Sequence, residues 1–509
     1  MEGGGHVDPC RRRGRPSDGR IMIDEESRLL VNGRLTRAAG GRTFDNLNPA
    51  TEEIIGRVAD ADAGDLDAAV AAARDAFDLT EWSVDHQLRG RCLLQLQDAL
   101  EREREEIRAE LVAEAGCPVS MTYMTQLDLP LADALRWPAA AIGDIPWVRD
   151  LPVVELFGLR SWRKVVKEPV GVVGVITPWS NPIGITLSKL GQALATGNTV
   201  VLAPAPETPW TAARLGRLIA EETEIPPGVV NVITASDRAI GEALVTDPRV
   251  DLIAFTGSTA TGRRIMEQGA STLKRLCLEL SGKSADIILD DADFAAKLCL
   301  AWMVCLHGGQ GSAMPSRLLV PRTRYDEAIE LVADGFSKVP IGDPTDPANI
   351  QGPLISAGQR DRVLRCIAGG VREGARLVVG GGRPTHLEKG YYVEPTLFAD
   401  VDNVMTIARE EILGPVLVVI PFEDDADAVR IANDSGYGLS GAVTSGSGKR
   451  AESVAARLRA GRVSVNGGIW YGADLPFGGY KASGLGVQNG IEGFEQYLET
   501  KALSGLVGR

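Results

Sequence analysis

The sequence predicts an α/β fold in which helices cover largely parallel sheets. The length of 509 residues leaves room for about three domains. The fold class follows from the alternation of apolar strands with segments of helical periodicity. Strands that are apolar on both faces are typical of parallel sheets buried between helices. The predicted strands are 170–176, 199–202, 229–233 and 252–255, and the predicted helices are 183–195, 208–222 and 239–245. Such sheets bind ligands at the carboxyl ends of their strands.

The segments on either side extend this pattern. We expect a packing helix from Asp65 and a second, longer helix that carries apolar residues from Leu93 to Leu111. Residues 147–167 alternate apolar and polar side chains about a glycine, which predicts a β-hairpin that can pair with another subunit. Beyond about residue 290 a second α/β domain is expected, with an acidic helix over 325–336, a tight turn at 380–382 and a strand over 416–421.

Composition excludes several classes of partner. Lys and Arg number 54 against 68 Asp and Glu, and the resulting net charge of −14 is a poor match for nucleic acid or anionic lipid. The longest apolar runs are too short to cross a bilayer, so no membrane partner is expected. Residues 1–20 lack the apolar stretch of a signal peptide and are predicted to be a disordered tail.

The cysteines and histidines predict neither a disulfide framework nor a metal site. The seven Cys form no CxxC pair, which indicates a reducing, cytoplasmic environment, and the four His lack the spacing of metal ligands.

One glycine-rich turn is a candidate phosphate site. The strand at 252–255 continues into TGSTATG at 256–262, and we expect a helix to begin near Arg263. Backbone N–H groups in such a turn and the helix N-terminus can bind a phosphate, although the segment is not GxGxxG and a plain strand-to-helix turn is the alternative.

Seven ordered segments connect this chain with a known family. From about Ile23 to Leu503 it resembles the aldehyde dehydrogenase superfamily. The matching segments are ITPWSNP (176–182), VVLAPAPETP (200–209), FTGSTATG (255–262), LELSGKS (278–284), GGQGSAMPSR (308–317), EEILGPV (410–416) and PFGGYKASG (476–484).

The resemblance implies a three-part architecture. It consists of a Rossmann-like coenzyme domain over 21–146 and 170–281, an α/β catalytic domain over 282–480, and an oligomerisation arm and tail over 147–169 and 481–509. The partners it implies are a small aldehyde and a second copy of the chain, in a homodimer or homotetramer.

The family mechanism begins with a cysteine thiolate that attacks an aldehyde. An asparagine side chain and a backbone N–H hold the oxyanion, hydride passes to NAD or NADP, and a glutamate activates water. Four residues of this chain match the family: Glu279 is the general base, Lys189 lies behind the oxyanion site, Ser258 meets the pyrophosphate and Glu411 holds a ribose. Further coenzyme contacts are implied at Ile176, Thr177, Pro178, Trp179, Gly257 and Leu280.

Several residues differ from the family at positions that carry out the reaction. The flanking residues of GGQGSAMPSR place Ser312 where the family has its catalytic cysteine. Ser180 stands at the oxyanion asparagine, with Asn181 next to it as a substitute if the loop shifts. Cys305, seven residues before Ser312, reads as a core thiol rather than as a displaced nucleophile.

Other departures affect the coenzyme side. Ala203 replaces a lysine that reaches the adenosine ribose, and Pro206 stands where NAD-preferring members often have glutamate, so weakened binding is expected, with NAD slightly favoured. Leu413 replaces the phenylalanine beside the nicotinamide ribose. Ser281 replaces a glycine and His307 replaces an asparagine.

Three hypotheses follow. The chain is an NAD(P)-dependent aldehyde dehydrogenase whose activity is weak or absent because of Ser312. Alternatively, it is an inactive scaffold, or a repurposed enzyme that uses Ser312 with Glu279 or His307 in a non-redox reaction such as ester hydrolysis. A natural divergent member is favoured over an engineered Cys→Ser trap, because the substitutions are several and cluster at the site. Trp302, Trp470 and Tyr471 either line the substrate tunnel or belong to the core.

Overall fold

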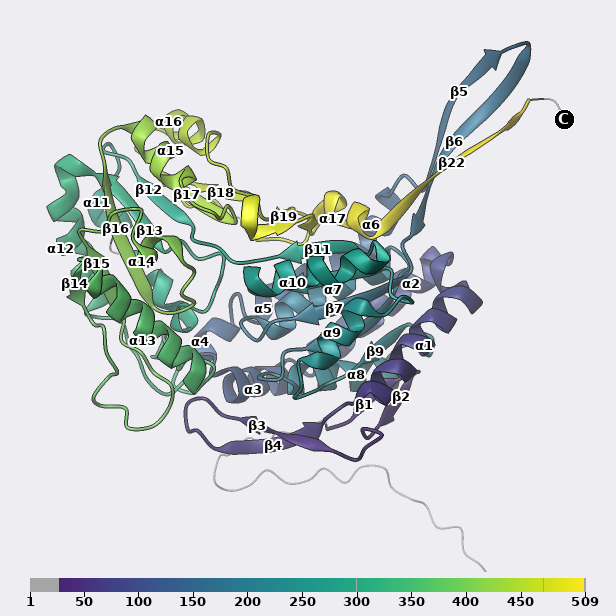
Figure 1. The fold of residues 1–509 in the computed structure, drawn as a ribbon, viewed down its shortest axis with the longest axis horizontal. Helices are drawn as coiled ribbons and strands as arrows, with labels where there is room; N and C mark the ends of the chain where they lie inside the picture. Colours follow the sequence, from purple (N-terminus) through teal and green to yellow (C-terminus); the bar gives the residue numbers. More distant parts are fainter. Residues whose placement is uncertain (1–26, 299, 470, 508–509) are drawn as a thin grey trace, which may run out of the picture.

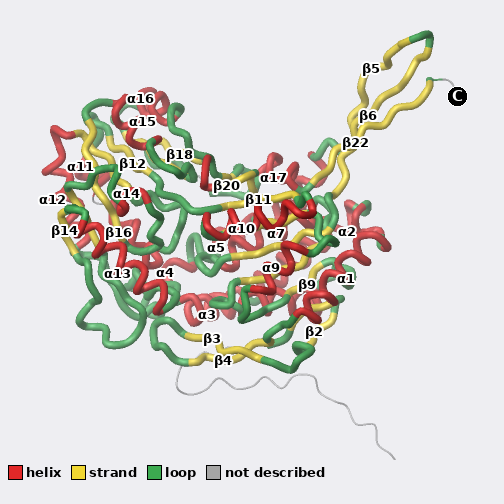
Figure 2. The backbone as a smooth tube through the Cα atoms, in the orientation of Figure 1, coloured by secondary structure: helices red, strands yellow, loops and turns green. Residues whose placement is uncertain are grey.

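Two helix-covered sheets form two lobes, and a thin three-stranded arm projects from one of them (Figure 1, Figure 2). The computed structural model describes residues 27–298, 300–469 and 471–507. The tail predicted at 1–20 and the side chain of Trp470 lie outside the described residues. The α/β fold class is confirmed.

The first sheet has eight strands. From one edge to the other they are β2 (Arg34–Thr36), β1 (Leu29–Val31), β9 (Val230–Val232), β8 (Thr199–Pro204), β7 (Val172–Thr177), β10 (Leu252–Thr256), β11 (Arg275–Glu279) and β20 (Gly484–Leu485). The five central strands, from β9 through β8, β7 and β10 to β11, are all parallel. At the two edges of this set, β1 pairs antiparallel with β9 and β20 pairs antiparallel with β11. The strands predicted between 170 and 255 are therefore confirmed.

Helices bury both faces of this sheet. They are α1 (Ala63–Leu79), α2 (His86–Arg102), α3 (Arg104–Ala115), α4 (Val119–Thr122), α5 (Asp128–Asp133), α6 (Arg136–Ala141), α7 (Pro182–Ala195), α8 (Trp210–Glu222), α9 (Ala239–Thr246) and α10 (Thr259–Gly269). Val173 and Val175 face one core with α2, α7 and α8, while Val172 and Ile253 face the opposite core with α1, α9 and α10. This alternation explains the nearly continuous apolar strands, because both faces of each strand need apolar side chains.

Two helix predictions need correction. The long helix expected from Leu93 to Leu111 is divided into α2 and α3 at Glu103, whose backbone is not helical and whose carboxylate binds Arg214 and Arg217. The helix expected near Arg263 begins at Thr259, because the Ser258 side chain accepts a hydrogen bond from the backbone N–H of Thr261 and so caps the helix there.

The second lobe contains a seven-stranded sheet. Its order is β14 (Arg376–Val379), β15 (Thr396–Ala399), β16 (Val416–Phe422), β13 (Arg317–Pro321), β12 (Ala285–Ile288), β17 (Ser440–Thr444) and β18 (Arg462–Val465). Its helices are α11 (Phe294–Leu298), α12 (Tyr325–Phe336), α13 (Ala357–Arg372), α14 (Thr406–Arg409), α15 (Asp425–Asn433) and α16 (Gly448–Ala455). The helix and the strand predicted here, 325–336 and 416–421, are both confirmed. Gly380 and Gly381 adopt positive φ in the expected turn after β14.

The arm is the predicted hairpin with one added strand. Strands β5 (Val148–Leu156) and β6 (Leu159–Pro169) pair antiparallel, and β22 (Leu498–Leu506) pairs along β6. Of the C-terminal segment expected in the arm, the described residues join the hairpin through β22. Before it, β20 joins the first sheet, β21 (Val487–Gln488) pairs with β19 (Phe477–Gly478), and α17 (Gly490–Gln496) contacts α7. The hairpin of β3 (Thr43–Leu47) and β4 (Ile54–Ala59) lies along the lower edge in Figure 1, away from the arm.

Candidate active site

The carboxyl ends of the central parallel strands meet at one edge of the first sheet. Ile176 pairs in register with Ala203 on β8 and with Phe255 on β10, and Thr256 pairs with Glu279 on β11. The segments that follow, residues 177–179 and 257–258, therefore leave the sheet at the same edge. These are the segments in which we expect coenzyme contacts, and edges of this kind are the usual ligand sites of parallel sheets.

Three of the predicted coenzyme residues contact neighbouring segments. The Thr177 hydroxyl lies 3.3 Å from that of Thr186. Trp179, which follows Pro178, packs with Leu306 against a small apolar cluster. The backbone N–H of Leu280 donates to the carbonyl of Ser483, and so ties the segment after β11 to the C-terminal region.

The N-terminus of α10 opens at this edge. The N–H of Gly257 donates to the carbonyl of Glu279, and the side chain of Ser258 caps the helix. The N–H of Thr259 is already bound by the Ser281 hydroxyl. A helix N-terminus carries partial positive charge and attracts anions.

Lys189 and Glu279 form a buried ion pair beside this edge. The Lys189 Nζ atom on α7 donates a 2.8 Å hydrogen bond to Glu279 Oε2 at the end of β11. The hydroxyl of Thr256 donates to the same carboxylate oxygen. The candidate general base is thus held by two donors.

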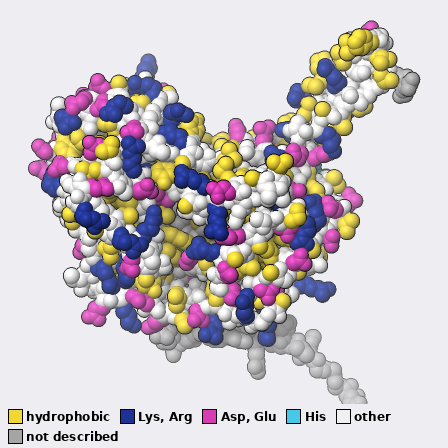
Figure 3. Space-filling view, viewed as in Figure 1, with side chains coloured by type: hydrophobic (Ala, Val, Ile, Leu, Met, Phe, Trp, Pro, Cys, Tyr) yellow, Lys and Arg dark blue, Asp and Glu magenta, His cyan; other side chains and the backbone are white. Residues whose placement is uncertain are grey.

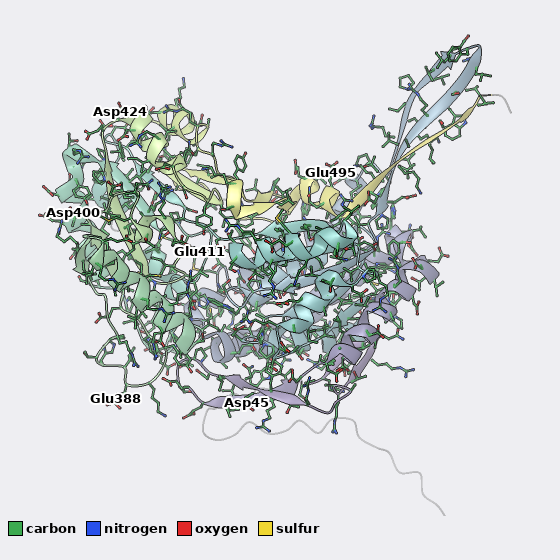
Figure 4. The ribbon with its side chains drawn as sticks, viewed as in Figure 1. Asp45, Glu388, Asp400, Glu411, Asp424 and Glu495 are labelled. Carbon is green, nitrogen blue, oxygen red and sulfur yellow. The ribbon has the colours of Figure 1, made fainter. Side chains whose placement is uncertain are left out.

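Ser312 lines a small cavity formed by the linker at Gly282 and by loops of the second lobe. Glu411 and Leu413 line the same cavity, so the structure brings together three residues expected at the site. Figure 4 labels Glu411, which lies where the two lobes meet. Gly282 forms another part of the wall, and a Cβ atom on it would come within 2.4 Å of the Ser312 carbonyl oxygen, so this approach requires glycine.

The Glu411 carboxylate is positioned by the linker between the sheets. Its Oε1 atom accepts a 2.9 Å hydrogen bond from the N–H of Gly282. Burial raises the pKa of Glu411, while the Ser281 hydroxyl and the Gly282 N–H act in the opposite direction. The cavity therefore contains a carboxylate that is both desolvated and fixed in place.

Among the described residues, no base is hydrogen-bonded to Ser312. The Ser312 hydroxyl makes no hydrogen bond to any other residue within the described ranges. His307 is buried and is not among the residues that line the cavity. Burial lowers the pKa of His307 to about 4, with the Ser180 backbone acting in the opposite direction. Neither a Ser312–His307 nor a Ser312–Glu279 hydrogen bond is present.

Ser180 and Asn181 precede α7. The Asn181 side chain caps this helix, because its Oδ1 accepts from the N–H of Gly184 and its Nδ2 donates to the carbonyl of Thr125. The carbonyl of Ser180 accepts from the Gln126 amide. Asn181 does not line the Ser312 cavity, and its engagement in the cap opposes the expected substitution for the oxyanion asparagine.

The thiols are structural. Cys92, Cys117, Cys277, Cys305 and Cys366, the cysteines within the described ranges, are all free. Cys305 is buried in an apolar cluster of the second lobe, and its burial raises the pKa of the thiol, which agrees with a core role rather than a displaced nucleophile.

Within the described part of the chain, no group of three or more His, Cys, Asp or Glu side chains could hold a metal ion. Over the same residues, no helix has both the length and the apolarity required to cross a membrane. Trp302 packs against the apolar cluster that contains Cys305.

The sequence reasoning missed three contacts. Thr256 was not expected to bind Glu279, Gly282 was not expected to hold Glu411, and Ser281 was noted only as a departure. The serine in LELSGK was the sequence feature from which a hydrogen bond by the Ser281 hydroxyl could have been predicted. The other two contacts depend on how β10 and the linker lie beside β11, which spacing along the chain does not give.

Comparison with known proteins agrees with this geometry. The model of the aldehyde dehydrogenase family matches residues 36–503. The chain is 43% identical over 486 residues to a 3-succinoylsemialdehyde-pyridine dehydrogenase of Pseudomonas sp., covering 94% of this chain and 98% of that protein. It is 39% identical over 486 residues to a geranial dehydrogenase of Castellaniella defragrans, covering 95% and 99%.

Solved structures agree along the whole fold. An aldehyde dehydrogenase of Mycobacterium tuberculosis complexed with NAD+ has a TM-score of 0.91 and 40% identity, covering 96% of this chain and 100% of that one. A cysteine-to-alanine variant of aldehyde dehydrogenase C from Pseudomonas syringae, complexed with NAD+ and octanal, has a TM-score of 0.89 and 36% identity, covering 95% and 98%.

Proposed function

This chain belongs to the aldehyde dehydrogenase family, and from this premise we propose that it binds NAD and an aldehyde beside Ser312 but oxidises the aldehyde slowly or not at all. In this proposal the lobe built on the first sheet holds the coenzyme and the second lobe presents Ser312, with the division near residues 281 and 282. The observation that carries the proposal is a serine, without a base, at the position of the nucleophile.

A serine hydroxyl is a weak nucleophile unless a neighbouring group removes its proton. A cysteine ionises far more readily and needs less assistance near neutral pH. Ser312 has no such partner, because Glu279 is bound to Lys189 and Thr256, and His307 lies outside the cavity wall. The same absence gives ester hydrolysis through Ser312 little support.

The residues of the site fit a nicotinamide dinucleotide. Ser258 and the N-terminus of α10 suit its pyrophosphate, and the fixed Glu411 carboxylate can accept hydrogen bonds from ribose hydroxyls beside Leu413. When bound, the coenzyme supplies a hydride acceptor. The solved structures that contain NAD+ support NAD, as does Ala203, because a 2′-phosphate needs a cation that alanine does not provide.

Positions 203 and 206 also support weakened binding of the adenosine part. Ala203 ends β8 without a charge or a hydrogen-bonding side chain, and Pro206 offers none either. The remaining contacts, through Ser258 and Glu411, are expected to hold the coenzyme less tightly.

The arm supports self-association. Hydrophobic side chains gather along it (Figure 3), and Leu156, Phe157 and Leu159 at its tip are 62%, 93% and 57% exposed. Apolar surface of this kind on a projecting element is typical of an interface. We therefore propose a homo-oligomer in which the arm packs against a second copy of the chain.

Two measurements on the purified protein test the proposed function separately. Titration with NAD and with NADP measures coenzyme binding, and the formation of NADH over a panel of aldehydes measures oxidation. We expect saturable NAD binding with little or no NADH formation. Failure to bind either coenzyme would contradict the binding half, and turnover near ~10 s⁻¹, an ordinary enzyme rate, would contradict the other half.

A further inference from the structure

A second cavity lies on the other side of the linker that follows β11. It is small and is lined by Arg317 together with residues 283–285, 432–433, 437–441 and 458–460. None of its lining residues belongs to the Ser312 cavity, whose wall includes Gly282 and Ser316. The two cavities are nonetheless lined by sequence neighbours, Gly282 with Lys283 and Ser316 with Arg317.

The lining of this cavity is cationic. Lys283, Arg317 and Arg459 are among its lining residues, whereas no aspartate or glutamate is. Ser284 and Ser440 also line it, and their hydroxyls are hydrogen-bonded to each other. Cations and hydroxyl groups without a carboxylate form a surface that suits an anion.

The two buried cations of the cavity differ in their partners. The Arg317 guanidinium donates to the carbonyls of Lys283, Ile431 and Ala432 and to the Asn403 side chain. The Lys283 side chain is 2% exposed, and its Nζ atom binds no partner among the described residues. A buried amine without a hydrogen-bond acceptor is costly, so it indicates a site for a missing acceptor.

The surroundings explain why this amine needs an anion. Burial, together with the charge of Arg317, lowers the pKa of Lys283 to about 7. Cys366 on α13 and the carboxylates of Glu410 and Glu411 act in the opposite direction. An anion that contacts the Nζ atom would favour its protonated form and offset the repulsion between the two cations.

We propose that this cavity binds a small inorganic oxyanion, with Lys283 as its principal ligand. The site is connected to the Ser312 loop, because Ser440 donates to the carbonyl of Ala313 and the N–H of Ser316 donates to the carbonyl of Ser284. Anion binding is therefore expected to stabilise the loop that carries Ser312. The inference does not depend on the proposed oxidation.

Sulfate is the probe, since its charge stays constant near neutral pH. Calorimetric titration with potassium sulfate, at an ionic strength fixed with potassium chloride, would compare the unmodified protein, Lys283→Met and Lys338→Met. Lys338 is a surface lysine paired with Asp334, so its variant removes the same charge far from a buried site. We expect saturable binding by the unmodified protein and by Lys338→Met, and affinity at least tenfold weaker in Lys283→Met.

Sulfate bound at the N-terminus of α10 would be unaffected by Lys283→Met, so equal affinity in the three proteins would overturn the proposal. The unmodified protein provides a test that needs no variant. Because binding requires a protonated amine, its affinity should be about tenfold tighter at pH 6 than at pH 8. Absence of saturable binding, or equal affinity at both pH values, would overturn the proposal even if Lys283→Met failed to fold.

Discussion

The Nζ atom of Lys189 lies 2.8 Å from Oε2 of Glu279, and this hydrogen-bonded ion pair is shielded from solvent. It joins the middle of α7 to the carboxyl end of β11, so the residue expected to be the general base is also a structural link. Removing one member of such a pair leaves an uncompensated charge in the interior.

Lys189→Met should therefore destabilise the protein by about 3–5 kcal/mol, because Glu279 loses its cation. Urea unfolding measures this change. Lys501→Met is the matched control, since Lys501 pairs with Glu168 on the exposed arm and should cost less than about 1 kcal/mol. Equal losses in the two variants would contradict the assignment.

His307 should make the protein sensitive to acid. Its pKa is lowered to about 4 in the folded state, so between pH 6.5 and 4 the unfolded chain binds more protons at this position. Stability should therefore fall as the pH decreases through this window. His307→Leu should flatten this part of the stability–pH curve, as measured by urea unfolding at several pH values, and an unchanged slope would contradict it.

Periodicity was sufficient for the first sheet because Val173 and Val175 serve one core while Val172 serves the other. It failed where side chains override it. Apolar residues continue at helical spacing on both sides of Glu103, but the backbone of Glu103 is not helical. At this break, its carboxylate forms ion pairs with Arg214 and Arg217. Ser258 likewise begins α10 earlier than the glycines suggested.

Gly282→Ala should disrupt the Ser312 cavity. The added Cβ atom would lie 2.4 Å from the Ser312 carbonyl oxygen, and Gly282 also positions Glu411. We expect destabilisation of about 1–3 kcal/mol and weaker NAD binding. Gly448→Ala on α16, where a Cβ atom meets open space, should change neither quantity. Unaltered NAD binding in Gly282→Ala would contradict the role given to this glycine.

Phe157→Asp should weaken the oligomer, because Phe157 is 93% exposed at the tip of the arm. Light scattering after size-exclusion chromatography measures the mass. Leu273→Asp is a close control, since Leu273 is 91% exposed and has the same φ of 51° but lies on the body. An unchanged mass for Phe157→Asp, or an equal effect of both variants, would contradict an interface at the arm.

The sequence motifs predict the residues of the candidate site but not all of their contacts. Ser312, Glu411 and Leu413 were expected together and share one cavity. Asn181 is a candidate substitute for the oxyanion asparagine only if its loop shifts, and in the structure its side chain caps α7. Its hydrogen bonds with Gly184 and Thr125 depend on how the chain folds around it, and the PWSNP motif alone does not predict this.

The most direct test of the account is NADH formation by the unmodified protein and by Ser312→Cys, with NAD binding measured for both. We predict comparable NAD affinity and activity at least about 10²-fold higher in Ser312→Cys, because a thiolate forms where the serine lacks a base. Ordinary turnover by the unmodified protein, or no gain in Ser312→Cys despite intact NAD binding, would contradict the central claim that Ser312 limits this site.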